Sequence, residues 1–112
     1  MANLTFQVSG SGTQPGLYIP TMAVPGSGTV QATSPTGGCT IYFSIATGIS
    51  VSPSVPNNGG FFNLAGSTTY TFTFTSLDQT VEIAVGPPNT TSTSGMNMTQ
   101  ARTVHVGGVG NV

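Results

Sequence analysis

The chain has 112 residues, which is enough for one hydrophobic core and too few for two. It has one basic and two acidic side chains, and 3 % of its residues are charged where an ordinary soluble domain has about a quarter. This composition excludes nucleic acid as a partner and excludes binding to an anionic membrane, because both require several lysine or arginine side chains.

Strand-forming residues dominate the composition. Valine, isoleucine, threonine and the aromatic residues number 44 and outnumber the strong helix formers two to one. Short alternating runs are separated by glycine and proline clusters, as an all-β chain with many turns requires. The first of these runs predicts a strand over residues 4–8, where Leu4, Phe6 and Val8 alternate with polar residues.

The stretch from Gln14 to Gly28 has a different character. It begins and ends with the turn pairs Pro15-Gly16 and Pro25-Gly26, and Pro20 interrupts the apolar run Leu17, Tyr18, Ile19. Proline has no N–H group to donate to a central ladder. The sequence therefore predicts an edge strand or an extended arm here.

Short strands are expected to follow this arm. The first spans Thr29 to Thr33, and the second spans Cys39 to Ala46 with Cys39 on its core-facing side. Residues Ile49 to Val51 are expected to pair briefly, because Pro53 and Pro56 exclude central ladder positions just after them. A loop at residues 57–60, of sequence Asn-Asn-Gly-Gly, then leads to the extended segment Phe61 to Leu64.

The stretch from Thr68 to Val85 shows the clearest alternation in the chain. Tyr70, Phe72 and Phe74 alternate with threonines, which is typical of a strand with one buried face. The apolar positions then change parity, since Val81, Ile83 and Val85 are odd-numbered. We therefore expect a turn or bulge within Ser76 to Thr80, and an antiparallel hairpin on either side of it.

The C-terminal part of the chain offers two short elements. Residues Asn97 to Arg102 are the best helical candidate, with at most about one turn expected. Thr103 to Val106 is expected to form the last strand, with Val104 and Val106 facing inward. The glycine-rich tail from Gly107 to Val112 is expected to be loose.

These elements together predict an all-β fold. Residues 1–112 are expected to form a single antiparallel β-sandwich, immunoglobulin-like or jelly-roll, with extended N- and C-terminal segments. The run from 68 to 85 resembles strand pairs of immunoglobulin-like domains, although the paired cysteines and core tryptophan of antibody domains are missing. No run of 18 apolar residues exists, and Met1-Ala2-Asn3 does not open a signal peptide, so neither a membrane span nor export is expected.

Catalytic and metal-binding residues are scarce. A serine, His105 and Asp78 could supply the residue types of a hydrolase, but they lie in no supporting motif, and His105 is expected to point away from the core. Asp78 is better suited to capping a turn, and Glu82 is expected on an outer face. One histidine, one cysteine and two separate carboxylates make no known metal set, so no enzyme, metal or other cofactor is expected. Cys39 is interpreted as a small buried hydrophobic residue.

The best candidates for contact with a partner are apolar residues in exposed segments. Phe61 and Phe62 are neighbours in an extended segment, so one of the two rings should leave the core, unless a twist or bulge buries both. Leu17, Tyr18 and Ile19 in the proline-flanked arm form the second candidate.

A surface with so little charge offers weak repulsion between copies, so we expect a protein that works docked in an assembly. The other interpretation is a monomer that its hydroxyl groups keep in solution. In composition and architecture the whole chain resembles the decoration or cement proteins of tailed bacteriophages. This resemblance implies a structural virion protein made in the host cytoplasm, with capsid subunits as partners and a homo-oligomeric form such as a trimer.

Two other functions remain open from the sequence. One is a carbohydrate- or receptor-binding module of an adhesin or phage tail, with an aromatic side chain stacking on sugar. The candidates for that contact are Tyr18, Tyr42, Tyr70 and Phe62. The other is a subunit of a self-assembling surface filament.

Overall fold

The computed structural model describes residues 4–9, 16–18, 29–75 and 79–106. In these residues the chain forms nine strands and two 3-10 turns. The strands are β1 (Leu4–Ser9), β2 (Gly16–Tyr18), β3 (Thr29–Thr33), β4 (Cys39–Phe43), β5 (Ile49–Ser52), β6 (Phe61–Leu64), β7 (Thr69–Phe74), β8 (Gln79–Gly86) and β9 (Arg102–Val106). The 3-10 turns, η1 (Thr93–Gly95) and η2 (Met98–Gln100), lie between β8 and β9.

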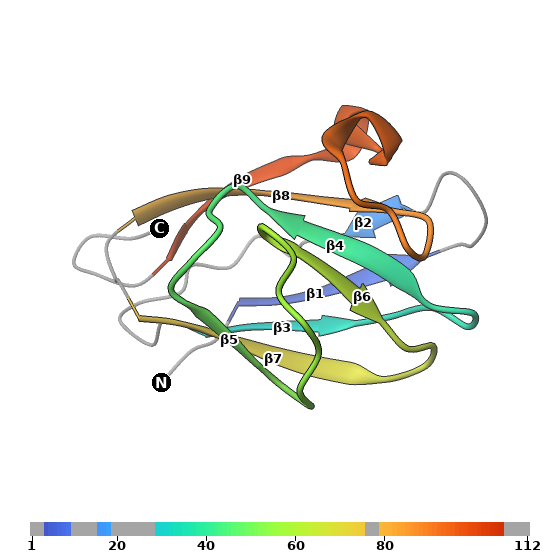
Figure 1. The fold of residues 1–112 in the computed structure, drawn as a ribbon, viewed down its shortest axis with the longest axis horizontal. Coiled ribbons are helices and arrows are strands. Elements are labelled where there is room, and N and C mark those ends of the chain that lie inside the picture. Colours follow the sequence, from blue (N-terminus) through green and yellow to red (C-terminus); the bar gives the residue numbers. More distant parts are fainter. Residues whose placement is uncertain (1–3, 10–15, 19–28, 76–78, 107–112) are drawn as a thin grey trace.

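The strands form two sheets that face each other across one core (Figure 1). One sheet has the order β2-β1-β3-β7-β5 and the other has the order β6-β4-β8-β9. This arrangement confirms the predicted all-β sandwich. One pair departs from the antiparallel expectation, because β1 and β3 run parallel. β2 pairs antiparallel with one side of β1, and β3 returns to the other side of β1, in the same direction as β1.

The hairpin predicted from residue 68 to residue 85 is wrong. β7 pairs with β3 and β5 in the five-stranded sheet, whereas β8 pairs with β4 and β9 in the four-stranded sheet. β7 ends at Phe74 and β8 begins at Gln79, so the chain crosses to the opposite sheet between them. Residues 76–78, where the turn or bulge was expected, lie outside the described residues. From β3 to β8 every connection makes the same crossing. The apolar faces of β7 and β8 therefore meet across the core and do not lie side by side on one sheet.

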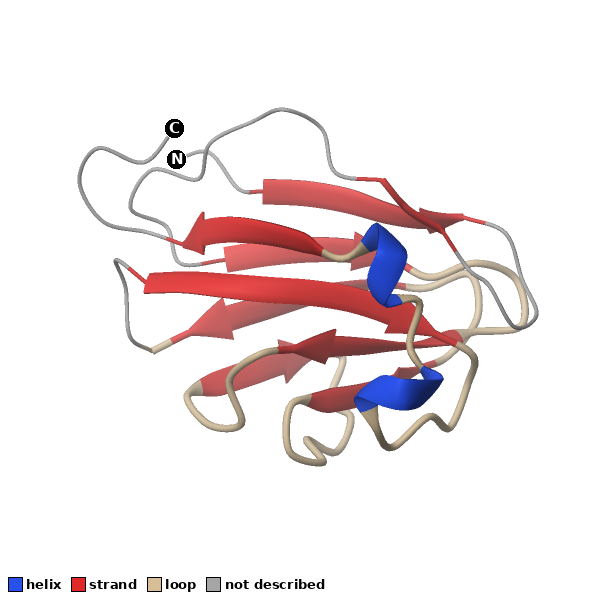
Figure 2. Cartoon of the chain, turned by 90° about the horizontal axis from the view of Figure 1, so that it is seen from above, coloured by secondary structure: helices blue, strands red, loops and turns tan. Residues whose placement is uncertain are grey.

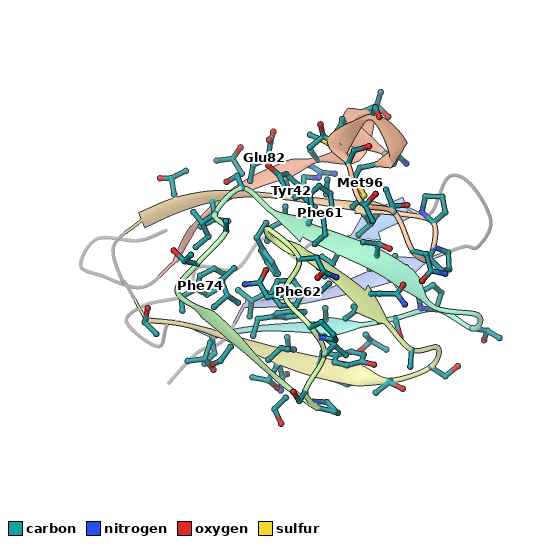
Figure 3. The ribbon with its side chains drawn as sticks, viewed as in Figure 1. Tyr42, Phe61, Phe62, Phe74, Glu82 and Met96 are labelled. Atoms are coloured by element: carbon teal, nitrogen blue, oxygen red, sulfur yellow. The ribbon has the colours of Figure 1, made fainter. Side chains whose placement is uncertain are left out.

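Four phenylalanine rings occupy the centre of the core. Phe43 of β4 makes edge-on contacts with Phe62 of β6 and with Phe72 and Phe74 of β7, at centroid distances of 5.8, 4.9 and 5.5 Å. All four rings are almost fully buried. Figure 3 shows Phe62 and Phe74 in the space between the two sheets. Edge-to-face contacts of this kind add to the hydrophobic contribution of the buried ring area.

Several smaller predictions can be compared with the structure. The arm from Gln14 to Gly28 contains β2, which is an edge strand as expected, while residues 14–15 and 19–28 lie outside the described residues. The turn of helix expected near Asn97 is η2. β4 ends at Phe43, earlier than the predicted Ala46. The tail from Gly107 to Val112 lies outside the described residues.

Candidate contact surfaces

The residues considered for catalysis are not assembled into a site in the described part of the chain. No three His, Cys, Asp or Glu side chains lie close enough there to hold a metal ion. His105 lies in β9 opposite Thr80 of β8, but its side chain is outside the description, as is Asp78. Glu82 is half-buried and lies opposite Thr103 in the β8–β9 ladder. The absence of enzymatic activity stays a prediction.

Among the described residues, no helix is both long enough and apolar enough to span a bilayer.

Cys39 is a core residue, as interpreted from the sequence. It begins β4, its side chain has no exposed surface, and it packs in the hydrophobic cluster between the sheets. Burial raises the pKa of its thiol from 9.0 to about 12, because the core does not solvate a thiolate. The thiol is therefore protonated and unreactive in the folded protein at neutral pH.

This buried thiol should make folding stability sensitive to alkaline pH. In the unfolded chain the thiol loses its proton near its ordinary pKa of 9.0, while the folded chain keeps that proton up to about 12. Raising the pH between these values therefore favours unfolding, and the free energy of unfolding should fall by about 2–3 kcal/mol by about pH 11. Between about pH 4 and about pH 9 it should change little, because so few groups titrate.

Urea unfolding measured across this pH range tests the prediction, with Cys39→Ala as the matched control. The variant keeps every other titratable group, so the difference between the two pH profiles isolates the thiol. An equal alkaline loss in both proteins would contradict the assignment. A thiol reagent added to the native protein should also react only as fast as the protein unfolds.

The charged residues in the described part of the chain, Glu82 and Arg102, both lie in the four-stranded sheet. Glu82 lies in β8, Arg102 begins β9, and Asp78 immediately precedes β8 in the sequence. Within the five strands β1, β2, β3, β5 and β7, by contrast, no residue carries a full charge. One entire sheet of the sandwich is therefore uncharged.

The outer face of this sheet is covered with short polar side chains. In β3, β5 and β7 the outward residues are partly or fully exposed. They are Thr29, Gln31, Thr33, Ser50, Ser52, Thr69, Thr71 and Thr73. The ladder places them in rows, and some bond within a row: the Gln31 amide donates to the Thr71 hydroxyl at 3.4 Å, and the hydroxyls of Thr33 and Thr69 lie 2.9 Å apart. The face can form hydrogen bonds but offers no charge for an ion pair.

The two neighbouring phenylalanines separate as expected. Phe62 is a core residue at 1 % exposure, whereas Phe61 lies on the outer side of the four-stranded sheet and is half-buried. Phe61 lies opposite Tyr42 of β4, and their ring centroids are 4.6 Å apart (Figure 3). Of these two candidates only Phe61 can touch a partner without unfolding of the core. Its role in partner contact stays a prediction.

The remaining candidates for contact with a partner or a sugar are either buried or not fully described. Tyr70 is buried, and its hydroxyl accepts a hydrogen bond from the backbone N–H of Ala65 at 2.8 Å, so it cannot stack on a ligand. Leu17 and Tyr18 lie in the edge strand β2, although nothing is described of their side chains. Ile19 lies outside the described residues.

The segment between β8 and β9 covers part of the outer side of the four-stranded sheet (Figure 2). The Thr40 hydroxyl donates to the carbonyl of Pro87 at 2.8 Å and accepts from the N–H of Thr90 at 3.1 Å. Met96 is buried and lies so close to Gly86 that a β-carbon there would be 2.7 Å from its sulfur. This cover buries Thr40, which alternation alone places on the solvent side. No pattern in the sequence predicts that this segment covers the sheet.

Comparisons with protein-family models, curated proteins and solved structures gave no match to this chain.

Proposed function

We propose that this protein is a non-enzymatic structural subunit of a virus particle, which decorates or cements the capsid of a tailed bacteriophage. The observation that carries the proposal is the uncharged five-stranded sheet. Its outer face presents hydroxyl and amide groups from at least three adjacent strands and no charge to keep a neighbour away. Such a surface suits permanent contact with protein neighbours.

The partner suggested by this surface is protein and not a charged polymer. Rim charges mainly accelerate encounter and discriminate between partners, and this protein has almost none. Hydrogen bonds from threonine and serine, together with an aromatic anchor such as Phe61, are sufficient for a docked subunit that is held by many neighbours at once.

The salt dependence of association tests this proposal. We expect the isolated protein to form oligomers, or to bind a larger protein lattice, with nearly the same strength at about 0.05 M and about 1 M NaCl, because salt weakens only charge–charge contacts. Light scattering at high protein concentration measures the mass at both salt concentrations. A monodisperse monomer at both would contradict an assembly role.

A carbohydrate-binding module is the second candidate, and the Tyr42–Phe61 pair is the observation that favours it. These two rings are half-buried on the outer side of a sheet, with Ser44 and Glu82 in the neighbouring row of the ladder. Aromatic faces with polar neighbours suit the apolar face of a sugar ring. A glycan array distinguishes the two functions, since Tyr42→Ala should abolish any binding seen, and complete silence removes this candidate.

A further inference from the structure

β5 is one of the two edge strands of the uncharged sheet, whose other edge is β2. It pairs with β7 on one side, from Ile49 opposite Phe74 to Ser52 opposite Thr71, and β7 is its one neighbour in the sheet (Figure 1). Edge strands present unpaired N–H and C=O groups that can bind a further strand, and natural proteins usually block them.

The phase of the ladder shows which groups of β5 point outward. The N–H of Thr75 donates to the carbonyl of Gly48 at 2.9 Å, so residue 48 is bonded to β7. Bonded residues alternate in an antiparallel pair, so Ser50 and Ser52 also bond to β7. The N–H and C=O groups of Ile49 and Val51 therefore point away from the sheet. Within the described residues, the structure records no hydrogen bond to these four groups.

The corresponding edge of the other sheet is partly occupied by the chain itself. There, Asn58 exchanges both backbone hydrogen bonds with Phe61 of β6, at 3.0 and 3.3 Å. Among the residues that the structure describes, none makes a backbone bond of this kind to the outward groups of Ile49 or Val51. Partly buried aliphatic side chains lie along and beside it, namely Ile45, Ile49, Val51 and Val55. An added strand would bury more of their apolar surface.

We propose that β5 pairs antiparallel with β5 of a second copy, about a two-fold axis that passes beside Ser50. In this register Ile49 of each copy is a bonded partner of Val51 of the other, which satisfies all four outward groups on each chain. The two Ser50 side chains lie directly opposite each other on the uncharged outer face. The two five-stranded sheets then form one continuous sheet.

A second copy fits this edge because the strand is complementary to itself. No residue of β5 is charged, so the two copies do not repel each other. Pro53 follows the strand and has no N–H to donate, which limits the ladder to the two bonded pairs. The interface is therefore small, and the dimer should be weak in dilute solution and strengthened where copies are already held close together. This pairing does not depend on the proposed role in a virus particle.

A disulfide test probes the register directly. Ser50 is exposed and faces its own copy across the axis, so Ser50→Cys should form a disulfide-linked dimer under mild oxidation, with a mass twice that of the 11.3 kDa chain. The native Cys39 is buried and does not compete. Thr73→Cys is the matched control, because Thr73 is also exposed and lies opposite Ser50 within the same chain. In the proposed dimer, however, Thr73 of one chain lies about 15 Å from Thr73 of the other chain, which is too far for a disulfide. Equal crosslinking of the two variants would overturn the proposal.

Charge substitutions at the same position give a second readout. Ser50→Asp alone and Ser50→Lys alone should each be monomeric in light scattering, because two like charges would lie directly opposite each other. An equimolar mixture should recover the dimer as a heterodimer. Both variants should keep the unfolding midpoint of the original protein, since Ser50 is exposed. Failure of the mixture to associate more than either variant alone would also overturn the proposal.

Discussion

Replacing Phe43 by alanine is expected to lower the free energy of unfolding by about 3–5 kcal/mol. Phe43 is completely buried and contacts three other rings, which come from both sheets of the sandwich. Truncation removes the buried ring area and leaves a cavity between rigid strands that cannot close it. Since natural domains are stable by about 5–15 kcal/mol, this loss is a large fraction of the total.

Phe61→Ala is the control for this prediction. It removes the same ring from the outer side of the same sheet, where Phe61 is half-buried against Tyr42, and should cost about 1 kcal/mol. Urea unfolding followed by far-ultraviolet circular dichroism measures both variants. Equal losses would mean that the four-ring cluster is not the centre of the core.

Replacing Gly60 by alanine is expected to cost about 3 kcal/mol or more, well above the cost of the same change at Gly59. Both glycines have positive φ angles, +67° at Gly59 and +95° at Gly60. A β-carbon on Gly60 would lie 2.5 Å from the carbonyl oxygen of Phe43 and 2.9 Å from that of Ile45, while one on Gly59 would have no atom within 4 Å.

Comparing the alanine variants of these two adjacent glycines therefore distinguishes the cost of a strained backbone from the cost of a steric clash. Gly59→Ala should show only the cost of a left-handed alanine, about 1–2 kcal/mol. Gly60→Ala adds a clash with backbone atoms, which cannot rotate away as a side chain can. The carbonyl of Gly60 also accepts a hydrogen bond from the N–H of Phe43 at 2.9 Å, so a shift of this residue would disturb β4. Chemical unfolding compares the two variants, and indistinguishable midpoints would contradict this account.

The contact surfaces were only partly predictable. Opposite directions for Phe61 and Phe62 follow from the geometry of any extended segment, and the structure confirms them. The pairing of Phe61 with Tyr42 does not follow, because it depends on the register between β6 and β4. The brief pairing predicted for residues 49–51 is confirmed as β5. Its position at an edge of the sheet was not predicted, and only the order of the strands shows it. Which of its backbone groups point outward depends on the phase of its bonds to β7.

The sequence by itself determined the strands and their buried faces. Alternation identified Phe72 and Phe74 as core residues, and the change of parity after Phe74 separated the strand now called β7 from β8, because burial of one face of a strand constrains every second residue. It did not determine which strands pair. Strand pairing uses backbone N–H and C=O groups, which are the same at nearly every residue. The local alternation of apolar and polar residues therefore does not distinguish a hairpin from a crossing to the opposite sheet. Only the tertiary structure placed β7 and β8 in different sheets and buried Thr40 under a distant segment, since these outcomes depend on packing of the whole chain.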